Sequence, residues 1–246
     1  MRWLLLAVLA LMVGVQPARA EPLVVDLSES VVRITTGFTG TKVLLFGAIE
    51  DEGEGNIVVV VQGPRHSITV RRKNRVAGIW INRGQVSFVE APSFYQVLSS
   101  ATMDEWLPLR TRETYQIGVE YLKLKPSEEI GPAKQAEYRD ALIRNMQREG
   151  RYGLLEGNVT VIGRQLFRAD LYLPANLPTG YYTIEVLLVR DGDVKSIKST
   201  PLLVTKSGIG AQIFRFAYEY PALHGVAAII IAVLAGLAGN AIFRKV

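Results

Sequence analysis

The sequence predicts a mainly β fold: two β-sandwich-like (Ig-like) units with a helical insertion between them, and one C-terminal transmembrane helix. Three observations lead to this prediction. Short Val- and Ile-rich segments recur between clusters of Gly, Pro, Asn and Asp, as in antiparallel sandwiches. A central stretch carries helix signals instead. The uncharged stretch 222–243 is about 22 residues long, enough for a helix to cross a bilayer.

Residues 1–20 have the three parts of a secretory signal peptide. Arg2 is followed by about 13 apolar residues, and Ala18-Arg19-Ala20 forms a small-x-small site before Glu21. As a helix, the apolar run would measure about 20 Å, which is too short for a hydrocarbon core of about 30 Å. We therefore expect cleavage after Ala20. The alternative is an uncleaved anchor.

The first β-rich unit, residues 21–100, contains short segments separated by turn residues. Ile57 to Val61 is apolar throughout, which favours a central strand. Trp80 is expected to fill the core, because burying so large an aromatic side chain is strongly favourable. Asn82-Arg83-Gly84 is expected to be a turn. The expected strands are 24–25, 31–34, 42–49, 57–62, 67–71, 78–82 and 86–90.

The connector, residues 101–153, is expected to be helical or mixed. Residues 132–149 read as a helix, with Pro132 in its first turn and Gly150 to end it. Its apolar stripe is narrow, so we expect this helix on a surface; the stripe consists of Tyr138, Leu142 and Met146.

The second β-rich unit, residues 154–206, is predicted to be a smaller sandwich-like unit. Asp191-Gly192 is a strong signal for a two-residue hairpin turn. The expected strands are 158–162, 165–173, 181–190 and 196–203.

The chain is predicted to end in a membrane anchor. An amphipathic juxtamembrane segment, 207–221, leads into the transmembrane helix 222–243, and the tail 244–246 carries two cations that predict a cytoplasmic C-terminus. Small residues recur every fourth position of the helix and allow close helix packing. The alternative is the ordinary Ala and Gly content of a lone anchor. This ridge comprises Ala228, Ala232, Gly236 and Asn240.

The net charge of +5 gives little support for nucleic-acid binding. Four of the positive charges belong to Arg2, Arg19, Arg244 and Lys245, so the expected exported body carries only +1. The chain has no Cys, which excludes disulfides and thiolate chemistry.

A basic run on one expected hairpin is the candidate contact for an anion or a partner. The alternative is an outward-facing strand that is charged to protect a sheet edge. Tyr95 is a further candidate contact, although Phe94 and Tyr95 could instead pack on opposite faces of one strand. The candidates are Arg65, Arg71, Arg72, Lys73, Arg75 and Tyr95.

Sequence motifs for catalysis are scarce. The chain has only two histidines, His66 and His224, and it contains no HExxH motif, Walker loop or dinucleotide fingerprint. We expect no catalytic residue, metal or cofactor. A hydrolase would require His66 beside a nucleophile in a cleft.

Several blocks along the chain resemble a family of uncharacterised transmembrane proteins found mostly in alphaproteobacteria. The resemblance implies no established activity, but it implies a gene neighbourhood that often includes a sulfite-exporter-like permease. His224 departs from the Tyr that the family usually shows. The blocks include Phe38-Thr39-Gly40, Ala77-Gly78-Ile79-Trp80-Ile81-Asn82, Pro92-Ser93-Phe94-Tyr95, Leu173-Pro174-Ala175 and Pro221-Ala222-Leu223-His224-Gly225.

Together these features predict a single-pass protein of the inner membrane with its bulk in the periplasm. The predicted function is a non-catalytic accessory subunit or partner of a transporter such as the sulfite-exporter-like permease. The expected partners are the lipid bilayer and a polytopic membrane protein or a second copy, met through the transmembrane helix. One alternative is a periplasmic binding module for an anion or envelope polymer, and the other is a hydrolase.

Overall fold

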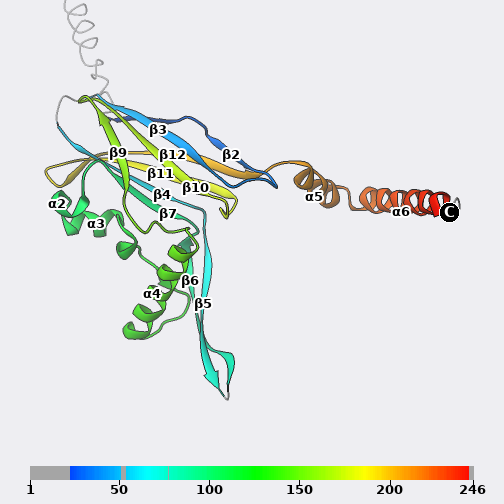
Figure 1. Cartoon of the computed structure of the whole chain (residues 1–246). Helices are drawn as coiled ribbons and strands as arrows, with labels where there is room; N and C mark the ends of the chain where they lie inside the picture. The colour runs from blue at the N-terminus through cyan, green and yellow to red at the C-terminus, as the bar shows by residue number, and fades with distance from the viewer. Residues whose placement is uncertain (1–22, 51–53, 77, 244–246) are drawn as a thin grey trace, which may run out of the picture.

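The computed structural model describes residues 23–50, 54–76 and 78–243. It confirms a mainly β protein with one apolar C-terminal helix (Figure 1). The predicted signal peptide and the cytoplasmic tail lie outside the described residues. The elements are β1 (Leu23–Leu27), β2 (Val31–Ile34), β3 (Gly40–Ile49), β4 (Asn56–Gln62), β5 (Arg65–Val76), β6 (Ile79–Pro92), β7 (Tyr95–Ser99), α2 (Met103–Trp106), α3 (Leu109–Tyr115), the 3-10 helix η1 (Val119–Tyr121), β8 (Lys125–Pro126), α4 (Pro132–Arg148), β9 (Gly157–Ile162), β10 (Leu166–Pro174), β11 (Gly180–Arg190), β12 (Asp193–Lys206), α5 (Ile209–Glu219) and α6 (Pro221–Phe243).

Nine strands form a sandwich of two layers. Their order is β1-β3-β10-β9-β7-β4-β11-β12-β2, with β1, β3, β10 and β9 in one layer and the others facing them (Figure 1). A parallel pairing of β7 with β9 joins the layers on one side. On the other side the chain passes from β1 in the first layer to β2 in the second. The apolar core between the layers includes Leu45, Phe167, Val186 and Leu202.

The strand pairing does not show two separate Ig-like units. β3 pairs along its length with β10, and β4 pairs with β11, so strands from 21–100 alternate with strands from 154–206. Turn residues mark where strands end, but they carry no information about which distant strands pair. The two predicted β-rich units are therefore halves of one sandwich.

β4 is buried on both of its faces, as its continuous apolar run predicts. Ile57, Val59 and Val61 point into the sandwich core, whereas Val58 and Val60 point into a second core on the other side of the layer. The helical connector covers that second core, and β4 is therefore the strand that both cores share.

α4 confirms the predicted helix of the connector. Pro132 occupies its first turn, and Gly150, with φ +68°, follows its end. The predicted apolar stripe is buried in the second core together with Ile143, so the helix packs one face against the sheet. The stripe residues are Tyr138, Leu142 and Met146.

β5 and β6 form one long hairpin, which changes two predictions. Asn82-Arg83-Gly84 is not a turn, because β6 runs through it with a register shift opposite Arg71–Lys73. A Cβ on Gly84 would lie 2.7 Å from the Tyr138 hydroxyl, so glycine here permits the approach of α4. The prediction that Trp80 fills the core is wrong, because this side chain is 65% exposed near the end of the hairpin.

α5 and α6 extend away from the sandwich (Figure 1). Residues Pro221–Asn240 of α6 have a mean hydropathy of 2.2 and are not buried against the rest of the chain. Among the described residues, α6 is the one helix that is long and apolar enough to cross a membrane. The aromatic side chains of α5 next to it are exposed, as expected at a membrane interface, and these are Phe214, Phe216 and Tyr218.

Candidate functional site

The structure places Tyr95 in the core and not on a contact surface. Its side chain is 1% exposed in the second core, while Phe94 packs in the sandwich core. The alternative of opposite faces is therefore the one observed. Tyr95 is therefore not available as a surface contact for an anion or a partner.

Tyr95 instead holds the connector against the sheet. Its hydroxyl donates to the Gln116 carbonyl at 2.6 Å and accepts from the Gly118 N–H at 2.8 Å. The ring packs edge-on against Tyr152, whose own hydroxyl donates to the Pro92 carbonyl. Burial raises the pKa of the Tyr95 phenol above its usual value, so the hydroxyl stays protonated and able to donate.

We expect Tyr95→Phe to lower the free energy of unfolding by about 1–3 kcal/mol. The substitution keeps the ring but leaves the Gln116 carbonyl and the Gly118 N–H without their partner. Chemical denaturation in detergent measures this change. Tyr172→Phe is the control, because Tyr172 is exposed on β10 and should change stability by less than about 0.5 kcal/mol. Equal effects of the two substitutions would contradict the assigned role of Tyr95.

The predicted basic residues do not form one patch. Arg65 lies at the start of β5, where it donates to the Gln62 side chain and to the Glu90 carbonyl. Arg72 forms an ion pair with Glu137 of α4, with 2.9 Å between nitrogen and oxygen. The remaining three cations lie toward the end of the hairpin, and they are Arg71, Lys73 and Arg75.

The outward surface of β1, β3, β10 and β9, which we call the outer face, carries apolar side chains that the sequence analysis did not single out. The registers align Val24, Ala48, Leu166 and Ile162 in one row across all four strands. Phe46 follows in the next row. The exposed apolar side chains of the outer face are those of Val24, Leu44, Phe46, Ile162, Leu166 and Tyr172.

The amino-acid pattern of β3 indicates the exposed apolar side chains of the outer face. Val43 and Leu45 point inward, yet Leu44 and Phe46 on the opposite side are also apolar and are exposed. A half-buried strand normally alternates between apolar and polar residues, and this strand does not. The opposite layer has its outward side covered by the connector, whereas no described element covers the outer face (Figure 1).

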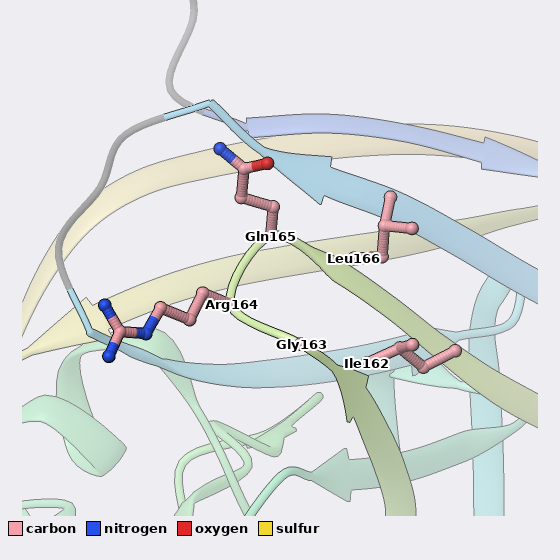
Figure 2. Close-up of a pocket in the computed structure, with 5 residues that line it drawn as sticks. All are labelled: Ile162, Gly163, Arg164, Gln165 and Leu166. Carbon is pink, nitrogen blue, oxygen red and sulfur yellow. The ribbon is translucent and has the colours of Figure 1, made fainter.

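A shallow hollow of about 530 Å³ lies at the turn between β9 and β10. Figure 2 shows Ile162 and Leu166 together on one side of this turn and Arg164 extending away from them. The lining residues offer one ionisable group, the Arg164 guanidinium, and no acid–base pair. The hollow is therefore best described as the edge of the outer face.

The small-residue ridge of α6 is open within this chain. Ala228, Ala232, Gly236 and Asn240 are all exposed, and a Cβ added at Gly236 would meet no described atom within 4 Å. This arrangement leaves the ridge available to another helix, and helix packing there stays a prediction.

His66 is the residue that the hydrolase alternative requires. His66 is exposed on β5 opposite Ala91, in a strand pair and not in a cleft. Within the described ranges, no group of three or more His, Asp or Glu side chains could hold a metal ion.

Comparison with protein families supplies the decisive observation. A family model described as "Putative transmembrane protein (Alph_Pro_TM)" matches residues 22–245. The chain belongs to this family. A comparison with curated proteins finds no match. This transmembrane family matches nearly the whole chain, which is consistent with a protein anchored in a membrane by α6.

Proposed function

We propose that this member of the Alph_Pro_TM family is a non-catalytic periplasmic subunit or partner of an inner-membrane transporter. The observation that carries the proposal is the outer face, which exposes a row of apolar side chains on a body whose C-terminal helix is long and apolar enough to cross a membrane. Exposed apolar patches of this kind mark interaction sites. The sulfite-exporter-like permease implied by the family resemblance is the candidate partner.

The composition of the outer face suits a protein partner better than a small ligand. Leu44, Phe46 and Tyr172 supply apolar and aromatic contacts, and Arg168 and Asp170 between them supply groups that can fix the register of a complex. The α6 ridge offers a second contact with the same partner inside the bilayer. Two contacts held on one chain would strengthen each other.

Purification of the tagged full chain in mild detergent tests the proposal. We expect the wild type to recover a polytopic membrane protein, identified by its mass, and the double substitution Val24→Asp with Leu166→Asp to reduce recovery at least tenfold. The control is Ile197→Asp on β12, because Ile197 is 46% exposed and Val24 is 47% exposed, and only Val24 lies on the outer face.

The same experiment examines the ridge separately. Ala232→Ile adds bulk on the ridge, whereas Ala238→Ile adds the same bulk six residues later, on a different side of α6. Loss of the partner with Ala232→Ile alone would support ridge packing. Repeated recovery of the wild-type chain by itself would reject the proposed function.

A further inference from the structure

The end of the β5–β6 hairpin exposes large apolar side chains. Ile79 is 68% exposed, Trp80 is 65% exposed and Ile81 is 39% exposed. Figure 1 shows the hairpin projecting beyond both the sandwich and α4, so the rest of the body cannot bury these side chains. A consecutive apolar triplet at a projecting end is costly in water and indicates a surface that meets another phase or molecule.

The register places cations beside this triplet. Arg75 pairs with Trp80 and Lys73 pairs with Asn82, so these side chains share one face of the hairpin. Ile81 pairs with Asn74, and Ile79 lies with Ile81 on the other face. The end of the hairpin therefore combines a basic and aromatic face with an aliphatic face.

The positive charge of this end is not neutralised locally. The sequence has no Asp or Glu between Arg65 and Val89. Among the described residues, Arg72 has Glu137 as an ion-pair partner, while Arg75 donates to the Gly78 carbonyl, which leaves its charge uncompensated. Arg71 and Lys73 have no carboxylate partner in the described part of the chain.

We propose that the hairpin end, residues 71–76 and 78–82, is a second membrane contact that binds the surface of an anionic bilayer. Trp80 would lie at the headgroup level, where its amphipathic ring is favoured, and Ile79 and Ile81 would enter the boundary of the acyl chains. Arg71, Lys73 and Arg75 would contact lipid phosphates, which attract basic residues near the surface. The long side chains can bury their stems and keep the charges at the phosphates.

Two features favour a bilayer over an anionic polymer or a protein. An anionic polymer would satisfy the cations but would offer nothing to Ile79 and Ile81, whereas an anionic bilayer satisfies both. In addition, α6 holds the chain in the bilayer, so the lipid surface stays close to the hairpin end. The second contact therefore forms at a high effective concentration of lipid. Contact with the bilayer requires the body to turn relative to α6, and we place this turn at Gly208, which has φ +111° and directly precedes α5.

The absence of Cys from the chain allows a direct test on the full-length protein. Ile79→Cys is labelled with an environment-sensitive fluorophore, and the protein is reconstituted into phosphatidylcholine vesicles with or without about one third phosphatidylglycerol. Lipids that carry a quencher near the headgroup report contact. We expect quenching in the anionic vesicles to exceed that in the neutral vesicles by at least about fivefold, since even one cation near an anionic surface contributes roughly this factor.

Two controls make the result specific. Thr160→Cys on the outer face carries the same label and should not be quenched. In the Ile79→Cys background, Lys73→Glu with Arg75→Glu should remove the quenching, whereas Arg168→Glu on the sandwich should leave it unchanged, with thermal unfolding showing that each variant is folded.

Several outcomes would overturn the proposal. These are an unquenched label at position 79, equal quenching in both vesicle types, or quenching at position 160 alone, which would place the sandwich on the bilayer. Because the vesicles contain no other protein, failure to recover a transporter in detergent would not affect this result. The two ideas can therefore fail independently.

Discussion

Val59→Asp is expected to destabilise the whole body of the protein strongly. Val59 is fully buried in the sandwich core, and β4 also lines the second core through Val58 and Val60. A carboxylate placed there without a partner costs about 4 kcal/mol or more, which is a large part of the 5–15 kcal/mol that stabilises a typical domain. Because both cores share β4, we expect the sandwich and the connector to lose structure together.

Circular dichroism and limited proteolysis in detergent measure this effect. The matched control is Val24→Asp, the same substitution on the exposed side of β1, which should cost less than about 1 kcal/mol. Val60→Asp, on the opposite side of β4, should be as damaging as Val59→Asp. A connector that stays protected from protease in Val59→Asp would show that the two cores fold independently.

The free energy of unfolding is expected to fall steeply above pH 10. Burial raises the pKa of three tyrosines above the usual value of about 10. Above pH 10 the unfolded chain loses these protons while the folded chain keeps them, so the stability present below pH 10 is lost as the pH rises. The three residues are Tyr95, Tyr152 and Tyr182.

The protons of the three tyrosine hydroxyls set how steeply the free energy of unfolding falls with pH. The loss should reach at most about 4 kcal/mol per pH unit, since each proton contributes about 1.4 kcal/mol per unit. Urea denaturation between pH 9 and pH 11 measures the slope, and Tyr95→Phe should reduce it by about one third. A stability that does not change across this range would show that these hydroxyls ionise in the folded state.

Features decided by neighbouring residues could be predicted from the sequence. Asp191 and Gly192 adopt positive φ values of 52° and 78°, and Arg190 pairs with Asp193, as the two-residue hairpin signal predicted. The continuous apolar run of β4 indicated burial on both faces. Pro132 and Gly150 fixed the ends of α4 because helix ends depend on local backbone chemistry.

Features decided by distant pairing could not be predicted in the same way. The pairing of β3 with β10 depends on residues far apart in the chain, and no local pattern specifies it. Gly84 looked like a turn residue because a bulge and a turn use the same amino acids. Trp80 was assigned to the core by its size alone, and its exposure follows from a hairpin that continues beyond the layer beneath it.

The exit of the anchor from the sandwich has a mechanical consequence. β12 leads directly to α5, and its last residues, Leu203–Lys206, pair in parallel with β2 while β11 holds the strand on its other side. A pull from the bilayer acts along β12, so it loads a ladder of backbone hydrogen bonds at the same time and does not peel them one by one. Because β2 follows directly on β1, tension along the tether would spread into both layers of the sandwich.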